Sequence, residues 1–189
     1  MKLIFAQGNP EPDYSDSRHN VGFLVLNTIA QKLEANWVNK PKFHALIVET
    51  NINDKRVLLI KPTAYYNEVG PVVRRLIDFY KLNTEEDLLI LHDDLTLKFG
   101  TVRVRERGGD AGNNGLKSIN AHINQPYARI RIGINNELSE KMDDATFVLA
   151  KFSIKESKQL ETLIVPHIIE LIQQFTHEAL QITSYKNLK

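Results

Sequence analysis

The sequence predicts an α/β protein built around a twisted, mixed β-sheet, and three observations lead to this prediction. Short apolar runs alternate with segments whose apolar residues recur at helical spacing, as in βαβ units. Strand-like runs at 44–50 and 55–61 flank a turn-rich segment at 51–54, which predicts a hairpin and an antiparallel part of the sheet. The 189 residues contain no repeat or linker, so we expect one domain over residues 1–189.

The first half of the chain supplies the expected core elements in order. Residues 2–7 form a buried strand, and residues 20–35 form a helix with one apolar face. Residues 68–80 form a second helix, with Pro71 in its first turn, where proline is tolerated. The continuous apolar run 88–91 is typical of a central strand.

The second half adds two strands with basic faces. Residues 101–107 and 129–134 both alternate apolar residues with arginine, and a glycine-rich loop and a helix near 114–123 connect them. Ser153 and Glu156 have the spacing of a capping box, so a C-terminal helix begins there. We expect that helix to extend to about Ile182 and to split or kink at Pro166.

Composition limits the function. The net charge of +1 excludes a generally basic nucleic-acid coat, so a polyanionic partner needs a local basic patch. The chain has no cysteine, which excludes disulfides and thiol nucleophiles. It has neither an apolar run of about 20 residues nor a leader-like start, so we expect a cytoplasmic protein without membrane contact.

Polar residues follow several of these elements and suggest a hydrolytic site. His19 lies near a helix start, where the helix dipole disfavours an imidazolium and leaves a general base. Asp93 follows an apolar strand and can orient that ring. Asn9, Asn67 and Asn114 can hold a peptide-like substrate and its carbonyl. No G-x-S-x-G, H-E-x-x-H or S-x-x-K motif is present, so a covalent nucleophile is not indicated.

Other interpretations of the same residues stay open. A lone histidine or aspartate at these places can simply cap or pack an element. His92, Asp93 and Asp94 together are compatible with a metal-dependent phosphohydrolase, although no further ligands are evident. The arginine faces and Lys117 are compatible with a non-catalytic RNA-binding module, or with arginines that only face solvent.

Taken jointly, the polar segments resemble the bacterial-type peptidyl-tRNA hydrolase family over residues 2 to about 152. The matching segments are Gly8-Asn9-Pro10, Tyr14, Arg18 to Gly22, Lys61-Pro62-Thr63, Asn67, Gly70, His92 to Leu95, Gly108-Gly109, Gly112, Asn114 to Lys117 and Arg131 to Ile134.

This resemblance implies a monomeric, three-layer α/β/α enzyme that needs no metal or other cofactor and cleaves the ester between a peptide and the 3′ end of tRNA. It implies that His19 is catalytic, that Asp93 supports it, and that Asn9 distinguishes blocked from free aminoacyl groups. Substrate-binding roles are implied for Tyr14, Tyr65, Asn67 and Asn114. We expect Arg105, Lys117 and Arg131 to be among the residues that contact tRNA phosphates.

The sequence departs from the family pattern at a few positions. Glu11 replaces a usual glycine, and Ser17 replaces a usual threonine. Asn113 replaces a usual histidine, and Tyr65-Tyr66 replaces a usual Phe-Met pair. The change at Asn113 is expected to alter the rate or the tRNA contacts, and the change at Tyr65-Tyr66 to enlarge and polarise one wall of the pocket. None of the four replaces an expected catalytic residue.

Overall fold

The computed structural model describes residues 1–177, 180–186 and 188. These residues form a mixed, eight-stranded sheet in the order β2-β3-β4-β1-β5-β7-β6-β8. Its strands are β1 (Lys2–Ala6), β2 (Val38–Lys40), β3 (Ala45–Ile52), β4 (Lys55–Pro62), β5 (Leu88–Lys98), β6 (Val102–Arg105), β7 (Ala128–Asn135) and β8 (Ser184–Tyr185). The central strands β4, β1, β5 and β7 run parallel, and the flanking strands pair antiparallel.

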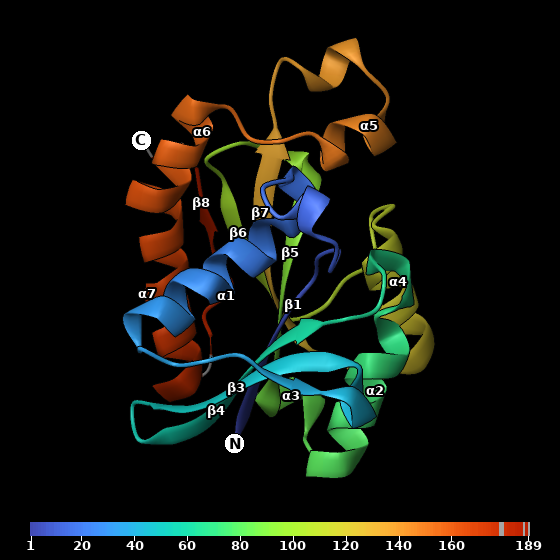
Figure 1. Cartoon of the computed structure of the whole chain (residues 1–189), viewed down its shortest axis with the longest axis vertical. Helices are drawn as coiled ribbons and strands as arrows, with labels where there is room; N and C mark the ends of the chain where they lie inside the picture. The colour runs from blue at the N-terminus through green and yellow to red at the C-terminus, as the bar shows by residue number, and fades with distance from the viewer. Residues whose placement is uncertain (178–179, 187, 189) are drawn as a thin grey trace.

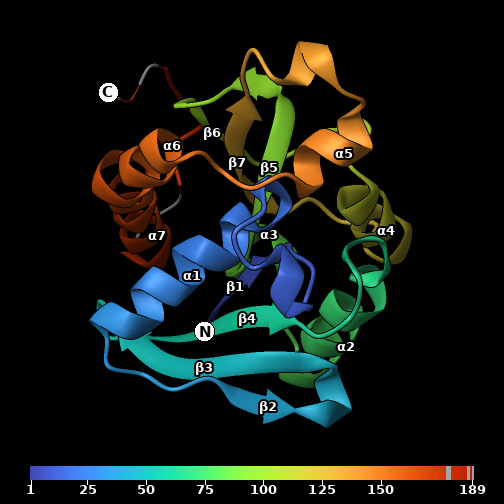
Figure 2. The same cartoon turned by 45° about the horizontal axis from the view of Figure 1, so that its top comes forward.

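Helices cover both faces of this sheet, as Figures 1 and 2 show: α1 and α7 lie on one side, and α2 and α4 on the other. The helices are α1 (Val21–Lys32), α2 (Gly70–Tyr80), α3 (Thr84–Asp87), α4 (Asn114–His122), α5 (Asp144–Leu149), α6 (Ile154–Gln159) and α7 (Val165–His177). Short 3₁₀ turns are η1 (Pro12–Tyr14), η2 (Arg18–Asn20), η3 (Pro41–Phe43), η4 (Tyr66–Glu68) and η5 (Ser139–Lys141). The expected α/β/α layering is confirmed.

The sheet separates two apolar clusters because successive strand residues point to opposite faces. In β1, Ile4 and Ala6 pack with α1 and α7, whereas Leu3 and Phe5 pack with α2 and α4. All four side chains are fully buried. The short apolar runs seen in the sequence are therefore strands buried on both faces, as expected for the parallel centre of such a sheet.

The hairpin and the first two helices form where the sequence predicts them. The β3–β4 turn contains Asn53 and Asp54, both with positive φ, a conformation that asparagine and aspartate tolerate. Pro71 lies in the first turn of α2. In contrast, β5 is longer than the apolar run that predicts it, because the strand continues through the polar residues after Leu91.

The C-terminal helix ends earlier than predicted. The capping box of Ser153 and Glu156 is present and begins α6. A π-helical turn, η6 (Leu160–Ile164), then separates α6 from α7 just before Pro166, so the predicted interruption is confirmed. The prediction of helix to about Ile182 is wrong, because residues 180–183 are not helical and lead into the edge strand β8.

No helix in the described part of the chain is long and apolar enough to cross a bilayer.

The site residues gather toward the carboxyl ends of the parallel strands. Gly22, at the start of α1, is part of the reason: a Cβ there would stand 3.0 Å from the backbone oxygens of Gln7 and Leu91. Glycine thus lets the start of α1, and the η2 turn before it, lie against the end of β1 and the neighbouring Leu91 segment of β5.

Candidate active site

His19 and Asp93 meet at one edge of the sheet, as the sequence predicts. His19 lies in η2, and Asp93 lies in β5, 74 positions further along the chain. The His19 Nδ1 and Asp93 Oδ2 atoms are 2.9 Å apart. The His19 side chain is 17% exposed and the Asp93 side chain 3%. The ring is therefore accessible while the carboxylate that holds it is buried.

The η2 turn that carries His19 is fixed from two sides. The Arg18 N–H donates to the Ala150 carbonyl at 3.0 Å, which ties the turn to the end of α5. On the other side, Asn20 donates to the Asn9 carbonyl and accepts from the Asn9 N–H, at 2.9 and 2.7 Å. The loops after β1 and α5 thus hold the histidine in place over the sheet.

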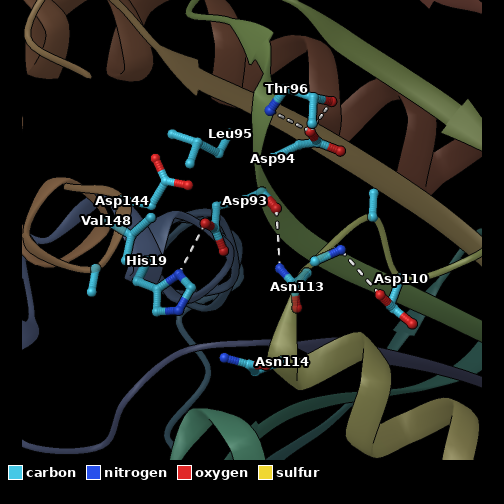
Figure 3. A pocket seen from close by; sticks show the side chains of 13 residues that line it. His19, Asp93, Asp94, Leu95, Thr96, Asp110, Asn113, Asn114, Asp144 and Val148 are labelled. Carbon is cyan, nitrogen blue, oxygen red and sulfur yellow. Dashed lines mark hydrogen bonds and ion pairs between the residues drawn. The ribbon is translucent and has the colours of Figure 1, made fainter. Parts of the chain in front are cut away.

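A cavity of about 360 Å³ opens beside this pair (Figure 3). Its lining residues are His19, Asp93 to Thr96, Asp110 to Asn114, Asp144, Ala145 and Val148. They come from η2, β5, the glycine-rich loop, the start of α4 and α5. Loops following separate strands converge on one hollow, which is the usual place for a ligand in an α/β sheet.

The expected substrate residues are distributed unevenly around this cavity. Asn114 lines it. The Asn9 Oδ1 atom accepts a hydrogen bond from the Tyr66 N–H at 3.0 Å, so its remaining amide group, Nδ2, is a donor. Asn9 itself is not one of the residues that line the cavity. Tyr14, Tyr65 and Asn67 do not line it either; they lie in η1 and just before or within η4, and Tyr65 is 57% exposed.

Two residues to which the sequence analysis gave no contact with the catalytic pair, Tyr66 and Asn113, lie against His19 and Asp93. The Tyr66 hydroxyl donates to Asp93 Oδ1 at 2.6 Å, and Asn113 Nδ2 donates to the Tyr66 hydroxyl at 2.7 Å. Burial and the neighbouring Asp93 carboxylate raise the pKa of Tyr66 well above its usual value. The only signal for them in the sequence was that both depart from the family's usual residues.

The alternative metal site at residues 92–94 is not formed as a cluster. His92 and Asp93 are adjacent in β5 and point to opposite faces. Asp94 is occupied by Arg131, whose Nε donates to Asp94 Oδ2 at 2.6 Å. Burial raises and hydrogen bonds from Thr96 and Arg131 lower the pKa of Asp94, and the result is below its usual value. The described residues contain no group of three or more His, Cys, Asp or Glu placed to hold a metal ion.

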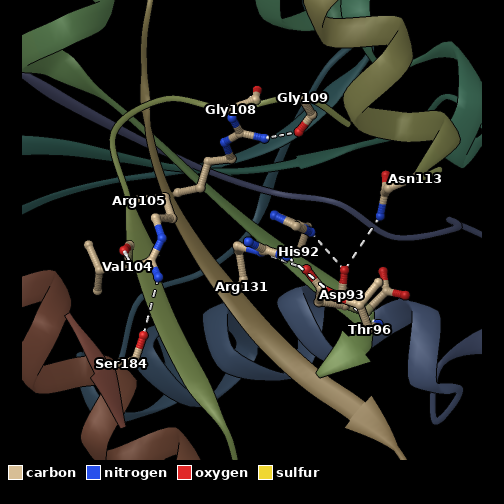
Figure 4. Close-up of polar contacts among 12 residues, drawn as sticks. His92, Asp93, Thr96, Val104, Arg105, Gly108, Gly109, Asn113, Arg131 and Ser184 are labelled. Atoms are coloured by element: carbon tan, nitrogen blue, oxygen red, sulfur yellow. Dashed lines mark hydrogen bonds and ion pairs between the residues drawn. The ribbon is translucent and has the colours of Figure 1, made fainter. Parts of the chain in front are cut away.

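A second, basic pocket of about 280 Å³ adjoins the cavity, and we call it the arginine pocket. Its lining residues are His92, Asp94, Arg105, Arg107 to Ala111, Leu116, Arg129 and Arg131. In Figure 4, Arg131 lies next to His92, and Arg105 lies farther away, near Val104 and Ser184. Burial lowers the pKa of His92 to about 4, so this histidine is neutral near pH 7 and adds no charge.

Arg105 of β6 and Arg129 of β7 bind backbone carbonyl groups rather than facing only solvent. Arg129 is buried and donates to the carbonyls of Gly108 and Gly109. Arg105 donates to the carbonyls of Val104 and Thr183 at 2.6 and 3.1 Å. Arg129 therefore shapes the glycine-rich loop, while Arg105 and Arg131 line the arginine pocket. Lys117 lies on α4, exposed and outside both linings.

Comparison with known proteins identifies the family of the chain. The profile of the family described as "Peptidyl-tRNA hydrolase" matches residues 3–188. The chain belongs to the bacterial peptidyl-tRNA hydrolase family. A peptidyl-tRNA hydrolase of Ligilactobacillus salivarius is 41% identical over 162 residues, covering 85% of each chain. One of Fusobacterium nucleatum is 34% identical over 188 residues, covering 100% of this chain and 92% of the relative.

Solved structures of the same family have the same fold. A peptidyl-tRNA hydrolase in complex with N-propanol superposes with a TM-score of 0.86 at 32% identity, over 94% of this chain and 89% of the other. An Arg119Gln mutant of the Acinetobacter baumannii peptidyl-tRNA hydrolase gives 0.84 at 30% identity, over 97% and 96%. The activity is that of a carboxylic ester hydrolase that releases tRNA from peptidyl-tRNA.

Proposed function

We propose that this peptidyl-tRNA hydrolase works by direct attack of water, with His19 as the general base and Asp93 as the residue that orients it. The supporting observation is the 2.9 Å contact between His19 Nδ1 and Asp93 Oδ2. A carboxylate only accepts hydrogen bonds, so the ring hydrogen belongs on Nδ1. That tautomer leaves the lone pair of Nε2 to take a proton from water.

In this mechanism the ester is hydrolysed directly by water, without a covalent enzyme intermediate. As Nε2 takes the proton, the water oxygen bonds to the ester carbonyl carbon and the carbonyl oxygen becomes anionic. When the tetrahedral intermediate collapses, the bond between that carbon and the 3′ oxygen of tRNA breaks. The imidazolium returns its proton to the departing 3′ oxygen, which yields free tRNA and a peptide acid.

We assign the asparagines to holding the peptide. Asn114 lines the cavity, and Asn9, which is hydrogen-bonded to Asn20 at the end of the His19 turn, offers its Nδ2 group as a second donor. We assign both to a peptide carbonyl or the developing oxyanion. A free α-amino group is cationic and hydrated, and its burial without a partner is unfavourable. A substrate whose α-amino group is blocked avoids this cost, so we expect the enzyme to prefer it over free aminoacyl-tRNA. We assign Tyr14, Tyr65 and Asn67 to parts of the substrate that extend beyond the cavity.

We assign the tRNA body to the basic side of the molecule. Arg105 and Arg131 line the arginine pocket beside the cavity, and exposed Lys117 on α4 extends this charge. Such residues neutralise phosphates without reading sequence. We further propose that the protein acts as a monomer in the cytoplasm, where ribosomes release its substrate prematurely.

His19→Ala tests the proposed base. The assay follows release of an N-acetylated amino acid from tRNA, with a chelator present in every reaction. We expect turnover to fall on the order of 10²–10⁴-fold, with tRNA affinity unchanged. Normal turnover by the variant would remove His19 from its role, and loss of wild-type activity to the chelator would favour a metal-dependent route.

A further inference from the structure

Tyr66 touches both members of the proposed catalytic pair. Its hydroxyl donates to Asp93 Oδ1 at 2.6 Å. Its ring stacks on the His19 ring, with centroids 3.6 Å apart and an angle of 10° between the planes. The tyrosine is 4% exposed and is not part of the described cavity lining, so it contacts the pair from behind rather than from the substrate side.

Asn113 settles the direction of the hydroxyl proton. The Asn113 Oδ1 atom accepts the Leu116 N–H at 2.9 Å as the N-cap of α4, so the group facing Tyr66 is the Nδ2 donor. A tyrosine hydroxyl has one hydrogen. Because its oxygen accepts from Asn113, that hydrogen is directed to Asp93. Asn113 therefore donates a hydrogen bond to Tyr66, and Tyr66 donates one to Asp93 Oδ1. His19 donates to the other oxygen of the same carboxylate.

Further contacts hold the backbone and the ring of Tyr66 in place. Its backbone N–H donates to Asn9 Oδ1 at 3.0 Å. The edge of its ring lies against Gly115, where a Cβ would stand 2.6 Å from Tyr66 Cε1. Only glycine at residue 115 leaves the ring this place. The side chain is consequently fixed by its backbone, its ring and its hydroxyl.

We propose that Tyr66 is a positioning residue for ester hydrolysis: it fixes the Asp93 carboxylate through its hydroxyl and the His19 ring by stacking, with Asn113 directing the hydroxyl. This inference rests on the proposed roles of His19 and Asp93. With the hydroxyl present, each Asp93 oxygen has its own donor, so the carboxylate cannot turn away from His19. The stacked aromatic face also favours the imidazolium that forms when His19 takes a proton.

Tyr66→Phe removes the hydroxyl and keeps the ring, and Tyr127→Phe is its matched control. Tyr127 is also 4% exposed, and its hydroxyl donates to Asn120 Oδ1 at 2.6 Å, away from the cavity lining. We expect kcat of Tyr66→Phe to fall about tenfold or more, the scale of one buried hydrogen bond to a charged group. KM and tRNA affinity should stay unchanged, and Tyr127→Phe should retain wild-type kcat.

The pH profile separates positioning from a merely structural effect. In the wild type, the hydroxyl and the His19 ring share the negative charge of Asp93, so removing the hydroxyl should move the acid limb of kcat/KM to higher pH. Asp94, Asp110 and Asp144 also line the cavity, and they are the same in both variants. The control should leave the limb in place.

Asn113→Ser provides a second, independent variant. Serine keeps an N-cap acceptor but is too short to reach the Tyr66 hydroxyl. We expect a smaller loss of kcat than in Tyr66→Phe, and a double variant whose loss is less than the product of the two single losses. Thermal unfolding of each variant shows whether the measured protein is folded.

Two results would overturn the inference. One is a Tyr66→Phe enzyme with the kcat and pH profile of Tyr127→Phe, and the other is a loss of kcat that matches the loss of folded protein. If His19→Ala is inactive while Tyr66→Phe behaves like its control, only the role of Tyr66 fails. If His19→Ala stays active, the proposed function itself fails.

Discussion

The guanidinium of Arg18 and the carboxylate of Glu156, 138 positions apart, form a two-pronged buried ion pair with N–O distances of 3.1 and 3.0 Å. The Arg18 guanidinium also lies over the rings of Phe147 and Phe152, 4.7 and 4.8 Å from their centroids. Arg18 directly precedes His19. This pair therefore joins the capping box of α6 to the turn that carries the proposed base.

Glu156→Gln should destabilise the fold strongly. The substitution leaves the Arg18 charge, which is 1% exposed, without its carboxylate. Breaking such a pair costs about 3 kcal/mol of unfolding free energy, measured by urea denaturation. Glu49→Gln is the control, because the Glu49–Arg56 pair is 45% and 57% exposed. It should change stability by less than about 1 kcal/mol. Equal losses of unfolding free energy in the two variants would contradict a special stabilising role for the buried Arg18–Glu156 pair.

The same pair predicts a pH dependence of stability. Burial raises the pKa of Glu156, but hydrogen bonds from Arg18 and the Ser153 N–H outweigh it and hold that pKa below the ordinary value of 4.5. A carboxyl with a lowered folded-state pKa stabilises the fold above its unfolded pKa and loses that contribution as the pH falls toward the folded value. Unfolding free energy should therefore decline below about pH 4.5, and Glu156→Gln should lack that part of the slope.

Asn9→Ala should weaken discrimination between substrates. It removes the Nδ2 donor that we assign to the peptide, and it also frees the Tyr66 N–H. We expect the ratio of kcat/KM for N-acetylated over free aminoacyl-tRNA to fall toward one. The two substrates are compared side by side on the same tRNA, so any general loss of activity cancels in the ratio. An unchanged ratio would reject the role of Asn9.

Arg131→Gln should change how salt affects tRNA binding. If Arg131 neutralises one phosphate, the slope of log affinity against log salt should become shallower by about 0.7 to 0.9. Arg56→Gln is the control, because Arg56 lies near the hairpin turn, at the opposite ends of the strands from the cavity. Equal slopes for wild type and Arg131→Gln would show that this arginine only anchors Asp94.

Local patterns were sufficient to predict much of the fold. The apolar run of β1 and the helical spacing of α1 leave little choice of element, because each buries its apolar side chains in one way only. The end of α7 was not predictable from pattern. Apolar residues such as Leu180 continue past His177, but they pack into the core without continuing the helix.

The site was predictable only where a residue type carries its chemistry with it. The contact between His19 and Asp93 followed from the resemblance and from strand-end positions. The contacts of Tyr66 were not predictable, because a tyrosine beside an asparagine in a loop has many possible orientations and only the fold brings its hydroxyl to Asp93 in β5. Arg129 shows the same limit: its place in an alternating strand suggested a solvated side chain, yet it is buried beneath the glycine-rich loop.

The close approach of Gly115 to Tyr66 restricts the order in which these two residues can be substituted. Alanine at 115 collides with the tyrosine ring and with the Gln7 amide, 2.9 Å from the added carbon. A bulkier residue becomes acceptable at 115 only after the aromatic ring has gone and Gln7 has shifted. A mutational library that varies 115 alone should therefore return glycine, whereas one that varies both positions together can recover new pairs.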